Sequence, residues 1–123
     1  MSASDSNKLV VLLTHNSSHD TASVGFTIAN AALSQGKEVA IFLTADGVDL
    51  ARQGASDLAH VRPFKPLDDL IEQFTGQGGI VWACSPCFQN RGHRVEDNLA
   101  GVTVTGAGPM LEWLDQGAST VCL

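Results

Sequence analysis

Short runs of apolar residues alternate along the chain with longer segments whose apolar residues recur at helical spacing. Five runs are predicted to be strands, over residues 8–14, 38–44, 79–83, 102–104 and 119–123. The first two runs are apolar at almost every position, which is typical of strands buried on both faces of a parallel sheet.

The segments between these runs are predicted to contain helices. A helix of about fifteen residues follows the first strand, with Asp20 or Ser18 as its N-terminal cap and Gly36 at its end. Further helices are predicted over 46–53, over 67–74 and between Pro109 and Gly117. Strands that alternate with helices are joined by right-handed crossovers, which makes the strands parallel. The predicted fold class is therefore α/β, a three-layer α/β/α sandwich with a mainly parallel five-stranded sheet.

Two of the predicted helices carry apolar side chains in stripes. The helix that follows Asp20 has one stripe formed by Ala22, Phe26, Ala29 and Leu33, and a second formed by Val24, Ile28 and Ala31. Packing on one sheet needs only one stripe, so the second indicates an interface with another subunit. The last helix is expected to bury Met110, Trp113 and Leu114.

Composition and charge restrict the kinds of partner. The chain has 123 residues, enough for one domain, and 44% of them are hydrophobic. Its 13 acidic and 7 basic residues give a net charge of −6. This counts against nucleic acid as the principal partner, because such binding depends on clustered cations. The longest strongly apolar run, residues 9–13, is far shorter than the roughly twenty residues of a membrane-spanning helix.

The N-terminal segment and the cysteines indicate the compartment. Residues 1–7 lack the basic start and apolar centre of an export signal, and we expect a disordered tail there, followed by a single domain over 8–123. The three cysteines are an odd number, which does not fit a closed set of disulfides. We therefore expect a cytoplasmic protein that does not associate with membranes. Separately, we predict no cofactor.

Polar segments follow the predicted strands at the edge of the sheet where α/β proteins bind their ligands. They cover residues 15–20, 44–47, 84–94 and 106–109. The candidate residues for substrate binding or electrostatic support are His15, Asn16, Arg91, His93 and Gly106. Gly106 and Gly108 lack the third glycine of a dinucleotide fingerprint, since position 111 is Leu111. Gly106 and Gly108 are instead predicted to form a tight turn before the last helix, and the N–H groups of this turn are a candidate site for a small anion.

The segment Cys84-Ser-Pro-Cys87 carries the clearest chemistry. Cys84 leaves the third strand, Ser85 is a good helix cap, and Pro86 is favoured at the first helical position. Cys87 then falls in the first helical turn, where unpaired N–H groups and the helix dipole favour a thiolate. We predict that Cys84 and Cys87 are the catalytic residues, whereas Cys122 between two apolar neighbours is assigned to the core.

These motifs resemble the DsrE/DsrF/TusD superfamily, including its YchN-like branch, over about residues 8–123. The resemblance rests on the alanine-rich first helix, on Asp46-Gly-Val-Asp-Leu-Ala, on Trp82-Ala-Cys-Ser-Pro-Cys-Phe-Gln-Asn-Arg-Gly and on the C-terminal segments 101–106 and 117–123. It implies that Cys84 occupies the position of the sulfur-accepting cysteine. Cys87 matches a second cysteine that YchN-like members have and many sulfur carriers lack.

The resemblance implies a small sulfur-relay protein, a possible sulfurtransferase, in which Cys84 becomes a persulfide and passes its sulfur on. Its partners would be sulfur-donor and sulfur-acceptor proteins or small thiols, and a homotrimer or homohexamer is expected. Two alternatives stay open. One is a thiol–disulfide redox protein that uses the same pair, and the other is a non-catalytic module that binds a small molecule or a partner.

Two further constellations favour structural interpretations. His15 and His19 with the two cysteines have the ligand types of a zinc site, but their order and separation do not match a zinc finger, and no metal is expected. Asp46, Asp49 and Asp57 lack the dense oxygen-ligand pattern of a calcium loop. They are predicted to form a solvated acidic face.

Overall fold

The computed structural model describes residues 6–123 and contains one five-stranded sheet. The strands are β1 (Lys8–Leu13), β2 (Glu38–Leu43), β3 (Ile80–Cys84), β4 (Val102–Thr105) and β5 (Ser119–Cys122). The helices are α1 (Asp20–Ser34), α2 (Leu67–Gly76), α3 (Ser85–Asn90) and α4 (Gly108–Asp115), with 3-10 helices η2 (Ala45–Ala51) and η3 (Val95–Asp97). Of the predicted tail, residues 1–5 lie outside the described residues, and Asn7 already hydrogen-bonds Gly36.

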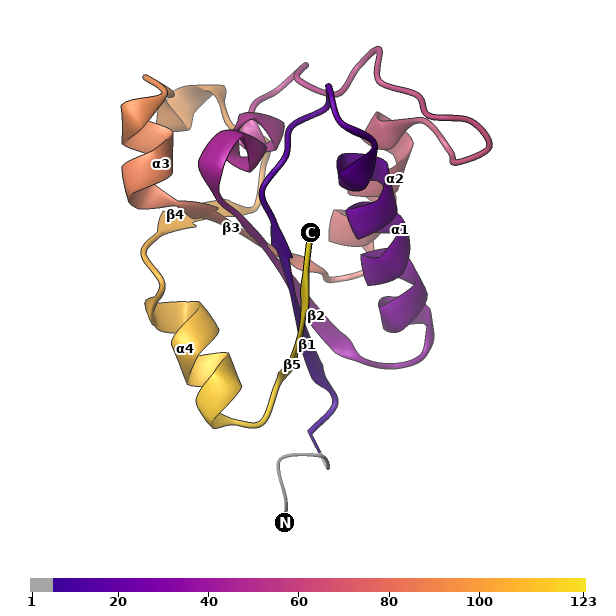
Figure 1. Ribbon diagram of the computed structural model, residues 1–123, viewed down its shortest axis with the longest axis vertical. Helices are drawn as coiled ribbons and strands as arrows, with labels where there is room; N and C mark the ends of the chain where they lie inside the picture. The colour runs from indigo at the N-terminus through magenta and orange to yellow at the C-terminus, as the bar shows by residue number, and fades with distance from the viewer. Residues whose placement is uncertain (1–5) are drawn as a thin grey trace.

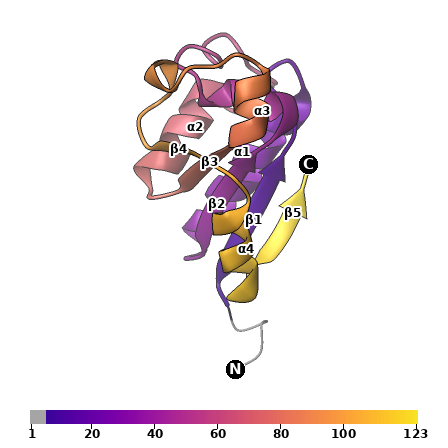
Figure 2. The same cartoon turned by 90° about the vertical axis from the view of Figure 1, so that its left-hand side faces the viewer.

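All neighbouring strands are parallel, in the order β4-β3-β2-β1-β5. Strands β1 to β4 follow one another in one direction across the sheet. After β4 the chain crosses back over the sheet, and β5 pairs with the other side of β1 (Figure 2). The two directions put helices on both faces, with α1 and α2 on one face and α4 on the other (Figure 1). The predicted three-layer α/β/α sandwich is therefore confirmed.

The core has two parts, one on each face of the sheet. The larger part joins strand side chains such as Val11 and Ile41 to α1 and α2. At its centre Phe26 and Phe74 are almost fully buried and meet edge to face, with ring centroids 5.7 Å apart, an arrangement worth about 0.5–1.5 kcal/mol beyond burial. The smaller part consists of Val10, Ala40, Phe42 and Trp82, with Met110 and Trp113 packed against it.

Two predictions about burial are wrong on the face of the sheet that carries the smaller part of the core. Met110, Trp113 and Leu114 are half-buried rather than buried. Cys122, assigned to the core, is exposed. The reason is that β5 is an edge strand with successive side chains on opposite faces. Val121 therefore packs on the α1 side, whereas Cys122 points to the face that α4 covers incompletely.

The ends of α1 show how its boundaries arise. Gly36 follows the helix with φ +86°, a conformation that favours glycine, so the predicted end is confirmed. The predicted cap is wrong, because His19 caps the helix and its Nδ1 accepts a hydrogen bond from the Thr21 N–H at 3.2 Å. Ser18 instead donates its hydroxyl to Asn16, and Asp20 is the first helical residue.

The segment after β2 lies directly against the end of β1. The predicted helix over 46–53 is present as the 3-10 helix η2. A Cβ atom at Gly47 would lie 2.5 Å from the carbonyl oxygen of Leu13, so this close approach requires glycine. The contact brings the segments after β1 and β2 together. None of the helices between residues 6 and 123 has the length and apolar character needed to cross a membrane.

Candidate functional site

The segments that follow β1, β2 and β3 surround a cavity of about 350 Å³ at the carboxyl end of the sheet. It is lined by Thr14, His15, Ala45, Asp46, Cys87, Asn90 and Arg91. Its volume lies in the range of small-molecule sites, roughly 300–1,000 Å³. Three of the four polar segments that the sequence singled out thus meet at one place.

The two cysteines of the predicted motif lie at the junction of β3 and α3. Cys84 is the last residue of β3 and the cap residue of α3, with φ −61° and ψ 118°. Ser85 is therefore the first helical residue rather than the cap. Cys87 lies one turn further and lines the cavity. Both thiols are free and half-buried.

The surroundings of Cys84 act against its ionisation. Burial raises the pKa of the Cys84 thiol above its ordinary value, and the neighbouring Cys87 thiol raises it further. The backbone N–H of Cys87 acts in the opposite direction but does not outweigh burial. The sulfur packs against the hydrophobic clusters of both faces of the sheet, and a low-dielectric environment disfavours the charged form. The surroundings of Cys84 therefore favour the thiol over the thiolate.

Asp49 of η2 joins the elements around the cavity. One of its carboxylate oxygens accepts from Arg91 Nε at 2.8 Å and lies 2.5 Å from His93 Nε2. The other oxygen accepts from Arg91 Nη2 at 2.7 Å and from Asn16 Nδ2 at 3.0 Å. The structure thus brings together Asn16, Arg91 and His93, three of the predicted supporting residues, around a residue that was assigned to a solvated acidic face.

The hydrogen bonds of Asp49 determine its ionisation. Burial alone would raise the pKa of this carboxyl, but hydrogen bonds from Arg91, Asn16 and His93 hold it well below its usual range. The same contact raises the pKa of Arg91. Asp49 and Arg91 therefore form an ion pair at neutral pH, beside the cavity that Arg91 lines. Sequence reasoning missed Asp49, although its place between two apolar residues, Val48 and Leu50, was a signal that it is not simply solvated.

The comparisons with known proteins bear on what this site does. The sequence model of the DsrE/DsrF-like family matches residues 7–123. The chain belongs to this family. An uncharacterized protein of Methanopyrus kandleri, MK0008, is 32% identical to it over 102 residues, which cover 83% of this chain and 81% of that protein.

Solved structures share the fold of this DsrE/DsrF-like chain. The YchN protein of E. coli is 18% identical with a TM-score of 0.78, and covers 94% of this chain and 98% of its own. MTH1491, a protein of unknown function from Methanobacterium thermoautotrophicum, is 20% identical with a TM-score of 0.69, at the same coverage. BT1422 from Bacteroides thetaiotaomicron, also of unknown function, is 24% identical with a TM-score of 0.71, covering 100% and 98%.

Of the other two predicted supporting residues of this DsrE/DsrF-like chain, His15 lies at the cavity and Gly106 does not. His15 lines the cavity and stacks on His19, with ring centroids 4.1 Å apart. Within residues 6–123, no group of three or more His, Cys, Asp or Glu side chains is arranged to hold a metal ion. Gly106 is exposed and follows Thr105, the register partner of Cys84, outside the lining of the cavity.

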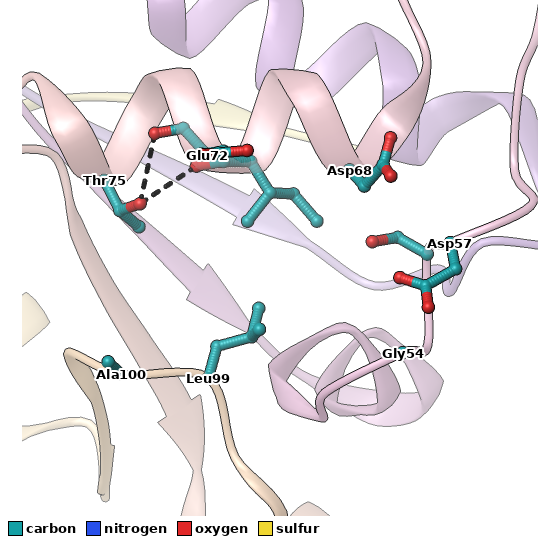
Figure 3. A pocket seen from close by; sticks show the side chains of 9 residues that line it. Gly54, Asp57, Asp68, Glu72, Thr75, Leu99 and Ala100 are labelled. Carbon is teal, nitrogen blue, oxygen red and sulfur yellow. Dashed lines mark hydrogen bonds between the residues drawn. The ribbon is translucent and has the colours of Figure 1, made fainter.

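A second cavity, of about 370 Å³, lies on the α2 side of the molecule. Figure 3 shows Asp68, Glu72 and Thr75 of α2 on one side of it, with Leu99 and Ala100 across from them. Its titratable lining side chains are the carboxylates of Asp57, Asp68 and Glu72. Because these groups offer no nucleophilic sulfur, the cavity beside Cys87 is the better candidate for a site of thiol chemistry.

Proposed function

We propose that this protein carries sulfane sulfur on the Cys84/Cys87 pair, accepting it from a donor persulfide and passing it to an acceptor thiol. The observation that carries the proposal is a pair of free thiols at the carboxyl end of β3, one of them lining a cavity, in a chain of the DsrE/DsrF-like family. Donor and acceptor are small thiols or cysteine-bearing proteins. The proposal assigns no metal or cofactor to the reaction.

The transfer is an exchange that needs no external oxidant. A cysteine thiolate of the protein attacks the terminal sulfur of a donor R–S–SH, and the donor S–S bond breaks as a protein persulfide forms. The thiolate RS⁻ leaves and takes up the proton that the attacking cysteine lost. In the second step an acceptor thiolate attacks the terminal sulfur of the protein persulfide, and the protein cysteine is regenerated.

Sulfur loading tests this function directly. Protein carrying Cys122→Ser, so that the exposed third thiol does not contribute, is reduced, desalted and incubated with glutathione persulfide. Intact-mass spectrometry is expected to show one added sulfur atom that dithiothreitol removes. The matched control carries Cys84→Ser and Cys87→Ser as well and is expected to gain none. A Cys122→Ser protein that gains no sulfur contradicts the proposal.

The proximity of the two thiols favours a second candidate, a thiol–disulfide redox protein. The Cys87 thiol and backbone both act on the ionisation of Cys84, so the sulfurs are near enough to influence each other. Equilibration with mixtures of reduced and oxidised dithiothreitol distinguishes the two functions. An internal Cys84–Cys87 disulfide, formed reversibly by a protein that takes up no sulfur, supports the redox function instead.

A further inference from the structure

We propose that Cys87, rather than Cys84, is the thiol that accepts sulfur from a small persulfide donor. This inference rests on the proposed sulfur relay and assigns its first step to one atom. The resemblance to sulfur carriers places the accepting role at Cys84. The arrangement of the cavity favours Cys87 for a donor small enough to enter it.

Position distinguishes the two cysteines. Cys87 lines the cavity together with His15, Asn90 and Arg91. Cys84 lies at the end of a strand and packs against hydrophobic residues on both faces of the sheet, whereas Cys87 packs only against the larger core. A donor that occupies the cavity therefore meets the Cys87 sulfur, with Cys84 further toward the sheet.

The charges around the cavity fit the same assignment. The Arg91 guanidinium lines the cavity and is held in place by two hydrogen bonds to Asp49. A fixed cation on the wall of the same cavity stabilises the negative charge on the thiolate that leaves the donor. The Asp46 carboxylate on the same cavity accepts the Asn16 N–H at 3.0 Å, which offsets part of its negative charge. At Cys84, burial raises the pKa of the thiol and so disfavours the nucleophilic thiolate.

The first step then involves one cysteine and one donor. The Cys87 thiolate attacks the terminal sulfur of R–S–SH, a bond forms from Cys87 Sγ to that sulfur, and the donor S–S bond breaks. RS⁻ leaves with the electron pair of that bond and takes up the proton released by Cys87. Cys84 remains a thiol throughout this step.

Two single-cysteine replacements test the assignment in the Cys122→Ser background. The parent protein, Cys84→Ser and Cys87→Ser are incubated with glutathione persulfide, and the added sulfur is followed by intact mass over time. The parent and Cys84→Ser are expected to load at similar rates. Cys87→Ser is expected to load at least about tenfold more slowly, because its remaining thiol lies outside the cavity lining and burial raises the pKa of that thiol. Thermal unfolding of all three proteins shows whether each variant is folded.

Each other outcome has a defined meaning. A parent protein that takes up no sulfur rejects the sulfur-relay function itself. If the parent takes up sulfur and Cys84→Ser does not, only the assignment to Cys87 is rejected. The same holds if Cys84→Ser and Cys87→Ser take up sulfur at equal rates. The parent protein, which keeps both Cys84 and Cys87, allows a second measurement that does not depend on whether either cysteine variant folds. The persulfide formed at the earliest time is alkylated and mapped by peptide mass spectrometry, and its location on Cys84 overturns the inference.

Discussion

The guanidinium of Arg91 and the carboxylate of Asp49 form a two-pronged ion pair, with N···O distances of 2.8 and 2.7 Å, although the residues are 42 positions apart in the chain. Parallel hydrogen bonds of this kind fix orientation as well as charge. The pair connects the C-terminal end of α3, the helix that carries Cys87, to η2. Asn16 and His93 join the same carboxylate and extend this connection to the segment after β1.

Removal of the charge at the centre of this network is expected to destabilise the protein. Asp49→Asn replaces a carboxylate that accepts four hydrogen bonds by an amide that cannot accept them all. Since hydrogen bonds to charged groups contribute about 1.5–3 kcal/mol each, we expect the free energy of unfolding to fall by about 2 kcal/mol. Urea unfolding at neutral pH measures this change in the free energy of unfolding. Asp57→Asn, at an exposed position, is the control and is expected to change stability by less than about 0.5 kcal/mol.

Acid is expected to remove the contribution of Asp49. The folded pKa of this carboxyl lies below its ordinary value of 3.8, so the unfolded chain binds the proton more readily than the folded one. The contribution is complete above pH 3.8 and is lost as the pH falls through the folded pKa. The stability difference between wild type and Asp49→Asn is therefore expected to shrink from neutral pH to about pH 2. A difference that stays constant contradicts the low pKa.

The ionisation of Cys84 is measurable in protein that contains no other cysteine. In the Cys87→Ser, Cys122→Ser protein, burial still raises the pKa of Cys84, so half-maximal iodoacetamide reactivity is expected above the ordinary pH value of 9.0. The same protein unfolded in urea provides the control, and its midpoint is expected near the ordinary value. A folded midpoint below that of the unfolded protein shows a thiolate stabilised at the start of α3.

The close contact between η2 and β1 predicts a glycine requirement. In Gly47→Ala the new methyl group lies 2.5 Å from the Leu13 carbonyl oxygen unless the backbone moves. We expect a loss of about 1–3 kcal/mol in stability, as for other overpacked sites. Gly76→Ala is the control, because a Cβ atom added at Gly76 has no neighbouring atom within 4 Å. This variant is expected to leave the free energy of unfolding unchanged or to raise it by up to about 1 kcal/mol. Equal thermal midpoints for the two variants contradict the prediction.

The second apolar stripe of α1 predicts self-association. Val24 and Ile28 are half-exposed in the single chain, whereas Phe26 on the first stripe is buried. Sedimentation equilibrium is expected to give a mass well above the 12.9 kDa of one chain. Ile28→Glu is expected to shift the protein toward the monomer, because it places a charge in an apolar interface. Ser34→Glu on the exposed end of α1 is the control, and a monomeric wild type rejects the interface.

Local patterns were sufficient for the elements of the fold. The nearly continuous apolar runs of β1 and β2 predicted these strands, because such runs are typical of strands buried on both faces of a parallel sheet. Strand order was not predictable, since it depends on the return of the chain from β4 to β5 across the whole sheet. For the same reason the apolar neighbours of Cys122 did not reveal that it stands on an edge strand.

The sequence predicted where the site lies in the fold, but it did not predict the ionisation of Cys84 and Asp49. Parallel strands end at a common edge, so the segments that carry Cys84, Cys87 and His15 were predicted to lie at the same edge of the sheet. The ionisation of Cys84 depends on how much core surrounds the strand end, which no local pattern reports. Asp49 acquires its partners from two other segments of the chain, so its environment exists only in the folded molecule.

The pairing of β5 with β1 has a consequence for synthesis on the ribosome. Strands β1 to β4 emerge before β5, and until β5 docks, one side of β1 has no neighbouring strand. An unpaired apolar strand such as this is a template for another polypeptide. Newly made protein is thus vulnerable to aggregation between the emergence of β4 and the arrival of β5, and shielding by a chaperone is most valuable in that interval.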